Sequence, residues 1–522
     1  MDLEDPAVPW DANCDVLVVG SGGGALTGAY TAAREGLRVI VVEATDRVGG
    51  MTAYSGGGMW FPCNPVLRRA GDDDTIEDAL AYFRTVVGDR TPADLQEAFV
   101  TGGAALVEYL EEDPAFEFQV LPWPDYFGAV AHARPNGRHI VPVPLPADRL
   151  GAQRGLLRAP LATDRGSEDP PQQLGGGQAL IGRFLLALDK LPTAQLWVNA
   201  RCEELIRLGG RVSGAVISTP DGSRRIHARR GILISAGGFE RNELLRKAFG
   251  VPGFSRDSMA PPGNCGAALQ AAIQVGADVD LMSEAWWAPG LTHPDGSSTF
   301  SLWFSRGIFV NGAGQRFTNE SAAYDRAARD VLTEMRAGRI SLPYWLIYDS
   351  RGGRVPPVLF TGVPLADADD YVHAGLWHAA DTLAELADHI GVSADQLTET
   401  VKRFNGFAAS GVDEDFGRGA EPFDKSAPGS PNPLVPIDRP PFRAASLGLS
   451  DLGTKGGLRT DAHARVIDVG GHVIPGLYAA GNSMAAVTGT TYPGGGNPVG
   501  ASMVFSHRAA LDMVESRGAR AR

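Results

Sequence analysis

The chain's most informative stretch reads Asp15-Val-Leu-Val-Val-Gly20-Ser-Gly22-Gly-Gly-Ala25 and continues, after an Ala-rich segment, into Leu37-Arg-Val-Ile-Val-Val-Glu43. An apolar strand ends in the pattern G-x-G-x-x-A, the Ala-rich segment can form a crossover helix, and a second apolar strand ends in an acidic residue. This order predicts a βαβ unit of the Rossmann type that binds a dinucleotide. An ordinary glycine turn is the alternative, and it would not require both strands and the acid.

Each residue type in this unit has its own physical role. Gly20 permits the tight turn, Gly22 with Gly23 lets the backbone approach a pyrophosphate, and Ala25 allows close packing of helix and strand. The N-terminus of the helix presents the positive end of its dipole to the phosphates. Glu43 can accept a hydrogen bond from a ribose 2′-hydroxyl, and an acid at this position disfavours the 2′-phosphate of NADP.

The composition limits the classes to which the protein can belong. A length of 522 residues exceeds what one hydrophobic core supports, so we expect two or more domains. A net charge of -14 and the lack of a basic patch argue against a nucleic-acid partner. Residues 1–10 lack the pattern of a secretory signal, and no apolar run is long enough to cross a bilayer. We expect a cytoplasmic protein, while peripheral contact with a membrane stays open.

Cysteine and histidine spacing gives no support for a metal site. The four cysteines lie far apart without a C-x-x-C motif, and the ten histidines include no H-x-x-x-H pair. We therefore expect reduced, structural cysteines and no bound metal.

The pattern along the chain predicts a discontinuous cofactor domain. Helical periodicity appears at 75–87, 93–110 and 176–191, and short apolar strands appear at 195–198, 203–208, 212–218 and 231–235. Between them, 114–175 is rich in Pro, Gly and Arg. Aromatic residues in this excursion favour an ordered segment over a site rather than a floppy surface loop.

A second domain is predicted where the composition becomes aromatic-rich. Its aromatic residues, most of which we expect in a core, are Trp286, Trp287, Trp303, Tyr344, Trp345 and Trp377. Helical patterns follow at 382–390 and 394–408, and after 446 strand patterns return with a glycine turn. We predict an α/β fold in which 1–283 and 447–522 form a Rossmann-like cofactor domain and 284–446 form an inserted α+β catalytic domain.

Further motifs lie along nearly the whole chain. They are Gly49-Gly-Met-Thr-Ala-Tyr-Ser-Gly-Gly-Gly-Met-Trp60, Ala236-Gly-Gly-Phe-Glu240, Gly314-Gln-Arg-Phe-Thr-Asn-Glu-Ser321, Gly411-Val-Asp-Glu-Asp-Phe-Gly-Arg418, Leu452-Gly-Thr-Lys-Gly-Gly-Leu458, Gly476-Leu-Tyr-Ala-Ala-Gly-Asn482 and Thr491-Tyr-Pro-Gly-Gly-Gly-Asn-Pro-Val-Gly500. With these motifs the chain, from about Cys14 to Ala510, resembles the flavin-dependent 3-ketosteroid dehydrogenases of the fumarate-reductase-like flavoproteins.

The resemblance implies FAD as the cofactor, and glycine turns spread along the chain suit an extended FAD better than NAD. The candidate cofactor-binding residues are Gly20, Gly22, Gly23, Ala25, Glu43, Gly50, Met51, Thr52, Ser55, Gly56, Gly57, Ala236, Gly237, Gly481, Asn482, Pro498 and Val499. Covalently flavinylated relatives carry a histidine after the first glycine-rich region. Residues 51–59 contain none, so we expect non-covalent FAD. A helix opening at 497 would stabilise negative charge on the reduced ring.

The resemblance also implies four catalytic positions. Tyr492 and the N–H of Gly496 would hold a 3-keto oxygen, and the small glycine would let that oxygen approach closely. Tyr324 would remove a proton from steroid C2 with help from Tyr126, and hydride would pass from C1 to flavin N5. The product would be a 1,4-dien-3-one, and an external quinone-like acceptor would reoxidise the flavin. Whether Tyr126 or the adjoining Phe127 faces the pocket stays open.

The chain departs from the usual members in one motif. They continue Tyr-x-Gly-x-Gly-Ala-Thr, whereas this chain has Gly-Gly-Gly496-Asn497-Pro498. The aromatic loop around Tyr126 is also unusual. Both changes lie near the expected pocket, so ring preference or substrate size can differ from the usual members.

Two other functions compete with this hypothesis. One is another flavin oxidoreductase of the group, acting at steroid C4,C5 or on a dicarboxylate; the latter needs cationic clamps, for which Arg306, Arg316 and His293 are isolated candidates. We expect His293 to be a solvated turn residue. The other is a non-catalytic flavin-binding protein, which need not keep Tyr324 and Tyr492 together. Their joint presence favours an enzyme.

Overall fold

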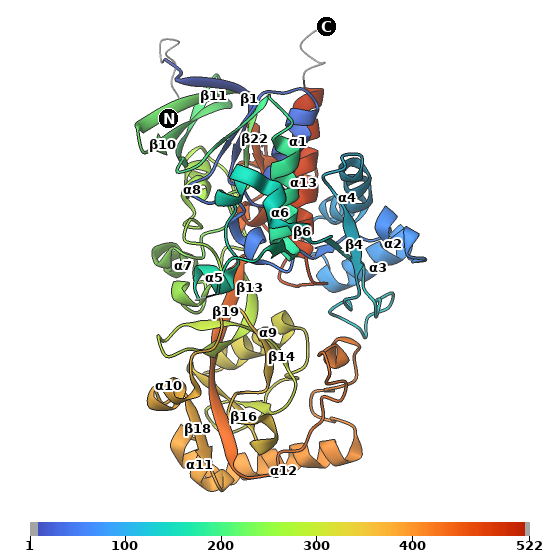
Figure 1. Ribbon diagram of the computed structural model, residues 1–522, viewed down its shortest axis with the longest axis vertical. Helices are drawn as coiled ribbons and strands as arrows, with labels where there is room; N and C mark the ends of the chain where they lie inside the picture. The colour runs from blue at the N-terminus through green and yellow to red at the C-terminus, as the bar shows by residue number, and fades with distance from the viewer. Residues whose placement is uncertain (1–8, 167, 517–522) are drawn as a thin grey trace.

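The computed structural model describes residues 9–166 and 168–516, and two sheets organise it along its long axis (Figure 1). The sheet in the upper half contains the opening βαβ unit and the C-terminal strands. The sheet in the lower half is formed by the aromatic-rich segment. This is the predicted α/β arrangement of a cofactor domain interrupted by an insertion.

The cofactor sheet has eight strands in the order β21-β22-β11-β1-β2-β8, with β10 and β9 extending β11 as an antiparallel ribbon. Its strands are β1 (Ala12–Val19), β2 (Val39–Val42), β8 (Ala194–Trp197), β9 (Arg201–Leu208), β10 (Arg211–Thr219), β11 (Gly222–Ile234), β21 (Arg465–Ile467) and β22 (Val473–Ala479). From β22 to β8 all neighbours are parallel. Strands buried on both faces explain why β2 is an unbroken apolar run.

The first and last long helices of the chain pack side by side on this sheet, blue and red in Figure 1. They are α1 (Gly23–Arg34) and α13 (Asn497–Glu515). A Cβ on Gly24 would lie 1.9 Å from the Ser502 Oγ, and one on Gly28 would lie 2.4 Å from the Leu233 Cδ2. These glycines therefore permit the close approach of α1 to α13 and to the sheet. α6 (Gly176–Leu188) packs on α1 as well.

Smaller elements surround the cofactor sheet. They are α2 (Pro65–Arg69), α3 (Ile76–Val87), α4 (Ala93–Glu111), α5 (Leu161–Asp164), α7 (Glu243–Phe249), α8 (Ala267–Gln274), β3 (Met59–Trp60), β4 (Phe118–Leu121), β5 (His139–Pro142), β6 (Leu145–Pro146), β7 (Gln173–Leu174), β12 (Val279–Asp280) and β20 (Gly457–Leu458). The described residues of the excursion, 114–166 and 168–175, therefore form an ordered segment, as predicted. Its strands have only two to four residues and were missed because such short segments show no periodicity.

The second sheet has seven strands in the order β15-β16-β19-β13-β14-β17, with β18 also paired to β19. They are β13 (Ala285–Thr292), β14 (Ser298–Phe304), β15 (Ile308–Val310), β16 (Tyr344–Tyr348), β17 (Val358–Thr361), β18 (Trp377–Ala380) and β19 (Phe442–Thr454). The helices of this half are α9 (Tyr324–Arg336), α10 (Ala368–His373), α11 (Leu383–Ile390) and α12 (Ala394–Ser410). The predicted boundary at 446/447 falls inside β19, a continuous strand that runs from this sheet toward the cofactor domain (Figure 1).

Several predicted helices begin at side-chain caps. Thr75 accepts from the Asp78 N–H before α3, Thr382 and Glu385 form a capping box at α11, and Ser393 caps α12. Other predicted bounds were less accurate. The strand expected at 231–235 is the end of the 13-residue β11, and the helix expected to reach residue 191 ends at Leu188.

The four cysteines are free thiols. Across 9–166 and 168–516, no helix combines the length and apolar character that a membrane crossing requires.

Candidate active site

A cavity of about 430 Å³ runs from the N-terminus of α1 to the second sheet. Its wall contains every predicted cofactor-binding residue except Ala25, namely Gly20, Gly22, Gly23, Glu43, Gly50, Met51, Thr52, Ser55, Gly56, Gly57, Ala236, Gly237, Gly481, Asn482, Pro498 and Val499. The glycine turns that are scattered in the sequence thus line one continuous space. Ala25 is fully buried inside α1 and does not line it, which suits its packing role.

Two helix N-termini open onto the cavity. α1 begins after Gly22 and α13 begins after Gly496, and neither helix has a side-chain cap or an acidic residue in its first turn. Uncapped N–H groups at a positive helix end bind anions, so a phosphate or a negatively charged ring can occupy these positions. This donor set fits the pyrophosphate and the pyrimidine ring of FAD.

Glu43 is held rigidly at the cavity wall. The Ser21 hydroxyl donates to Oε2 at 2.6 Å, and the Thr45 N–H and hydroxyl donate to Oε1 at 2.9 and 2.8 Å. A carboxylate has about four acceptor sites, so a ribose hydroxyl can still donate to it.

Gly20 has a φ of 105°, and a Cβ there would lie 2.3 Å from the Ser235 carbonyl oxygen, so the packing of β11 also requires a glycine at this position.

The four predicted catalytic residues converge on the other end of the cavity. Tyr324 is the first residue of α9, Tyr492 lies in the loop before α13, and Tyr126 comes from the 114–175 excursion. The Tyr324 hydroxyl donates to the Tyr492 hydroxyl at 3.2 Å, and the Gly496 N–H donates to the same oxygen at 3.4 Å. The Tyr126 ring lies edge-to-face on both, with centroids 5.6 Å from Tyr324 and 5.1 Å from Tyr492.

Burial keeps these phenols protonated. Desolvation raises the pKa of Tyr492 to about 12, and it raises the pKa of Tyr126 and Tyr324 well above the ordinary value for tyrosine. The protonated hydroxyls can donate hydrogen bonds to a substrate oxygen. For one of them to act as a base, a nearby positive charge or donor must stabilise the phenolate.

The glycine run before α13 is required by packing. Gly496 has a φ of 80°, and a Cβ there would lie 2.2 Å from the Gly58 carbonyl oxygen. A Cβ on Gly494 would lie 2.6 Å from the Trp60 ring. Gly496 thus has a second reason to lack a side chain, besides the access of a substrate oxygen to its N–H.

Tyr126, rather than Phe127, faces the cavity. Its N–H donates to the Pro493 carbonyl at 2.9 Å, and its carbonyl accepts from Arg326 at 2.9 Å. Phe127 does not line the cavity. The guanidinium carbon of Arg326 lies 5.1 Å from the centroid of the Phe127 ring. The excursion therefore delivers one tyrosine to the site.

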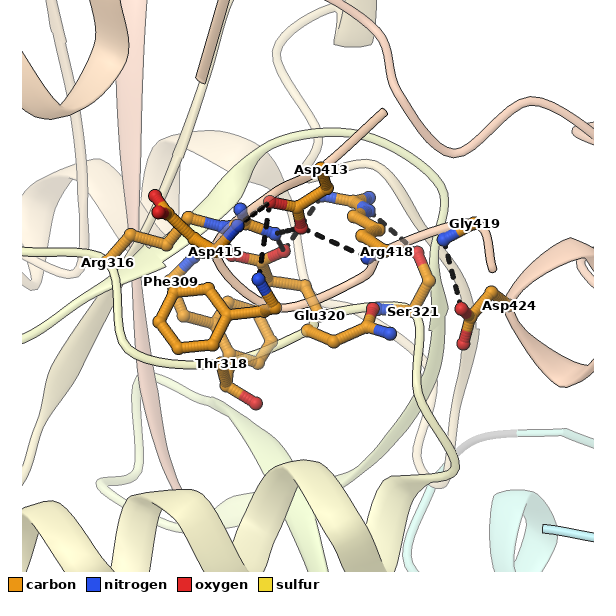
Figure 2. Close-up of polar contacts among 12 residues, drawn as sticks. Phe309, Arg316, Thr318, Glu320, Ser321, Asp413, Asp415, Arg418, Gly419 and Asp424 are labelled. Atoms are coloured by element: carbon orange, nitrogen blue, oxygen red, sulfur yellow. Dashed lines mark hydrogen bonds and ion pairs between the residues drawn. The ribbon is translucent and has the colours of Figure 1, made fainter. Parts of the chain in front are cut away.

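A buried ion-pair cluster fixes the segment that leads into Tyr324 (Figure 2). We call Arg316, Glu320, Asp413 and Arg418 the Glu320 cluster. Arg316 donates to both Glu320 oxygens at 2.8 Å and contacts Asp413 at 2.9 Å, and Arg418 donates to Glu320 at 3.0 Å. Arg418 also donates to the Ser321 hydroxyl at 2.9 Å. The turn before α9 is held in place by these contacts.

The side chains considered for a dicarboxylate clamp lie elsewhere. Arg316 belongs to the Glu320 cluster, and Arg306 donates to the Arg351 carbonyl. His293 is buried and hydrogen-bonded to Thr299 at 2.6 Å and Tyr371 at 2.9 Å, so the expectation of a solvated turn residue was wrong. A Pro-Asp-Gly turn follows it, but its own side chain points into the second domain's core. None of the three clamp candidates lines the cavity.

Sequence reasoning missed most of the apolar wall around the tyrosines. Its members are Leu121, Trp123, Phe300, Leu302, Trp303, Phe360 and Leu452. They come from several segments, and of them Leu452 alone stands in a quoted motif. Trp286, Tyr344 and Trp377 are buried core residues, as expected, and the core of Trp286 is the one that contains Tyr492, with ring centroids 4.8 Å apart.

Missed residues at the cofactor end are Ser21, Thr45, Arg158, Asn264, Ser483 and Ser502. Ser21 lies inside the fingerprint and Ser483 follows Asn482, so their neighbours gave a signal. Arg158 gave none, because it reaches the wall from the irregular excursion.

Comparison with known proteins identifies the family. The model of the FAD binding domain family matches residues 15–499. The chain is 35% identical to a 3-oxosteroid 1-dehydrogenase of Mycolicibacterium smegmatis, over 97% of this chain and 98% of the relative. The chain belongs to the 3-oxosteroid 1-dehydrogenase family of FAD-binding flavoproteins. Its cofactor is FAD, which the donors described above fit.

One solved structure and one further relative extend the comparison. The structure of a 3-ketosteroid delta1-dehydrogenase from Sterolibacterium denitrificans in complex with 1,4-androstadiene-3,17-dione matches with a TM-score of 0.87 and 32% identity, covering 97% of this chain and 100% of that one. A 4-oxocyclohexanecarboxylate 2-dehydrogenase of Sinomonas cyclohexanicum is 36% identical over 95% of this chain and 92% of the relative. The family thus includes proteins named for steroid and for monocyclic ketone substrates.

Proposed function

We propose that the protein introduces a double bond between C1 and C2 of a 3-ketosteroid. The observation that carries this proposal is the meeting of the Tyr324 and Tyr492 hydroxyls, 3.2 Å apart, beside the Gly496 N–H on the wall of the FAD cavity. The carbonyl oxygen and the α-carbon of a ketone are only two bonds apart. A base and an oxygen-binding donor that serve them must therefore be close neighbours.

The roles follow from the positions. The Tyr492 hydroxyl and the Gly496 N–H donate to the 3-keto oxygen and stabilise the enolate as C2 loses its proton. The phenolate form of Tyr324, reached after its hydroxyl proton leaves to solvent, accepts that proton, and Tyr126, packed against its ring, assists it. FAD supplies the hydride acceptor for the hydrogen at C1, at flavin N5. Cavity closure by aromatic side chains keeps water from the reacting carbons.

The cavity wall favours a neutral, apolar substrate. Its cations among the described residues are Arg158 and Arg201. Arg158 donates to the Thr45 hydroxyl at 2.7 Å, and Arg201 follows Ala200, whose N–H donates to the Glu43 carbonyl. Both therefore lie at the ribose end, away from the tyrosines.

A histidine on the same wall carries no charge either, because burial lowers the pKa of His139 to about 3. The carboxylate of 4-oxocyclohexanecarboxylate would find no cation on the described cavity wall near Tyr492. A steroid, by contrast, would contact the aromatic wall along its length, so we favour it over the monocyclic keto acid.

An anaerobic titration tests the proposal. Androst-4-ene-3,17-dione should bleach the oxidised flavin absorbance, and mass spectrometry should show a product lighter by two hydrogens. Parallel titrations use 4-oxocyclohexanecarboxylate, and a reductive assay uses fumarate with a reduced dye. Bleaching by the keto acid alone would replace the steroid as substrate, and activity on fumarate alone would overturn the desaturation.

The finer assignments belong to the same proposal. We infer that FAD is bound non-covalently, because 51–59 contain no histidine; acid precipitation should release the flavin into the supernatant. We propose a quinone-like external acceptor, which a soluble menaquinone analogue can test. Cytoplasmic location with peripheral membrane contact is tested by fractionation of cells and sedimentation with lipid vesicles. We also propose that 1–283 and 447–522 together form the FAD-binding domain and that 284–446 form the catalytic domain.

A further inference from the structure

Lys455 is a buried lysine beside the tyrosines. It follows β19, and its side chain has no exposed surface. Its Nζ donates to the Thr491 carbonyl at 2.7 Å and lies 4.3 Å from the Trp286 ring centroid and 5.9 Å from the Tyr492 ring centroid. An ammonium over an aromatic face is attracted by the ring quadrupole.

The charge of this lysine is incompletely compensated. Of the residues that the structure describes, Thr491 alone offers an acceptor within hydrogen-bond distance of Nζ, although an ammonium has three donors. The nearest carboxylate oxygen, Asp325 Oδ1, lies 4.0 Å away and has no hydrogen-bond partner itself. The second Asp325 oxygen accepts from Arg329 at 2.8 Å. Burial lowers the pKa of Lys455 to about 7.

Sequence neighbours connect Lys455 to both proposed reacting tyrosines. Thr491, which accepts its hydrogen bond, directly precedes Tyr492. Asp325, its nearest carboxylate, directly follows Tyr324. The backbone N–H of Lys455 donates to the Glu284 carbonyl at 2.8 Å, which fixes its origin.

We propose that Lys455 is a positioning residue whose buried ammonium stabilises the negative charge that develops on Tyr492 and on the substrate oxygen bound to it. Lys455 does not line the cavity, carries its proton below about pH 7 and acts through Tyr492. The proton from C2 goes to Tyr324, and the electron pair left behind moves onto the ketone oxygen. This inference rests on the proposed desaturation.

The expected size of the effect follows from Coulomb's law. Nζ lies 5.9 Å from the Tyr492 ring centroid, and charges about that far apart at an effective dielectric constant of about 20 interact strongly enough to change a rate by up to about 100-fold. The other charged or titratable groups facing Lys455 are Asp325 and Arg329 from α9, Glu284 before β13 and Tyr492. Asp325 and Glu284 are both paired to Arg329. Burial and, to a smaller extent, the charge of Asp325 raise the pKa of Tyr492, and the ammonium of Lys455 opposes both.

Three substitutions separate charge from hydrogen bonding. K455M removes both, K455Q keeps a donor for the Thr491 carbonyl without charge, and K455R keeps both. Because burial lowers the pKa of Lys455 to about 7, its charge is present below pH 7 and lost above it. K455M and K455Q should lower kcat about 10- to 100-fold at pH 6, with KM within about threefold, and the difference from wild type should shrink above pH 7. K455R should keep the wild-type kcat at pH 6.

Exchange of the C2 hydrogen with D₂O provides a second measurement, since it reports proton removal separately from hydride transfer. It should slow in K455M and K455Q by the same factor as kcat. The matched control is K402M, because Lys402 is exposed on α12 and pairs only weakly with Glu399 at 3.4 Å. K402M should behave as wild type in both assays.

Each outcome decides one of the two proposals. If wild type and K402M do not desaturate the steroid, the proposed function fails. If they do, and K455Q keeps the wild-type kcat and exchange rate at pH 6, the role of Lys455 is wrong. A loss of kcat in K455R equal to that in K455M also overturns it. Loss of flavin in both uncharged variants with retention in K455R would show that the charge serves folding, and it too overturns the proposal.

Discussion

Two buried charged regions flank Tyr324, and they are paired very differently. In the Glu320 cluster, both Glu320 oxygens accept from arginine, and Arg418 has further acceptors in the Gly307 and Phe304 carbonyls (Figure 2). Lys455 has one hydrogen-bond acceptor and a carboxylate at 4.0 Å. Charged side chains whose hydrogen-bonding capacity is fully used hold a segment in one geometry. A cation with few partners can still attract negative charge on a neighbouring group. The difference teaches that buried charges can have two roles beside one residue. The Glu320 cluster fixes the backbone before Tyr324, and Lys455 acts on the charge of its neighbours.

The largest effect is expected at Tyr324 itself, where the two regions meet. Tyr324→Phe should lower kcat up to about 10⁴-fold, because general base catalysis contributes up to that factor. FAD content and thermal stability should stay near wild type. Steroid desaturation at full rate with normal flavin binding would refute the base assignment.

Tyr344→Phe is the matched control for this substitution. Tyr344 is equally buried in the second domain, and its hydroxyl has no hydrogen-bond partner among the described residues. Its loss should leave kcat unchanged.

The next largest effect is expected when the Glu320 cluster is disrupted. Arg418→Met should destabilise the protein by about 3–5 kcal/mol, because it leaves Glu320 with one fewer cation inside the core. Urea unfolding of the FAD-loaded protein measures this. Glu320→Gln, a smaller change, should lower stability in the same direction. A loss below about 1 kcal/mol in both variants would mean that the Glu320 cluster does not hold the turn before α9.

Replacing Lys455 should change the free energy of unfolding in the opposite direction. K455M should stabilise the fold by roughly 1–4 kcal/mol at pH 7, because the desolvation penalty disappears while Asp325 keeps Arg329. The pKa of Lys455 is about 7 when folded and 10.5 as its reference value, so the unfolded chain binds more protons between these limits. Wild-type stability therefore rises from pH 7 to 10.5, and the advantage of K455M fades over that window.

Thermal unfolding of wild type and K455M at pH 7, 8.5 and 10 checks this. A constant difference between the two proteins across the series would contradict the depressed pKa.

The smallest effect is expected for an exposed pair. Arg84 of α3 contacts Glu97 of α4 at 3.0 Å, with about half of each side chain exposed. Arg84→Met should change stability by no more than about 1 kcal/mol, and 1 M salt should abolish the change. The same substitution at Arg418 should be insensitive to salt, which makes Arg84 its matched control.

The sequence predicted the cofactor end of the molecule well because local patterns specify it. The run from Asp15 to Glu43 carries strand, turn, helix and acid in one segment, and each part needs only its neighbours to form. Capping residues such as Thr75 and Thr382 marked helix starts for the same reason.

The apolar wall could not be predicted in this way. Trp123, Phe300 and Leu452 come from separate segments and meet only because β14 and β19 belong to one sheet and the excursion folds over it. Lys455 illustrates the same limit: it stands in a quoted motif, but its partner Thr491 is 36 residues away and its burial depends on the whole fold. The tyrosines themselves were found through a family resemblance.

The packing of α1 against α13 sets the order of events on the ribosome. The segment with Gly20 and Gly22 is synthesised early. Gly24 of α1, however, packs against Ser502 of α13, which is synthesised much later. At about 5–20 residues per second, the helix that covers it emerges roughly 25–100 s later. During that interval the nascent protein carries a finished cofactor signature with no cofactor site. The site for FAD is therefore complete only after α13 has been synthesised.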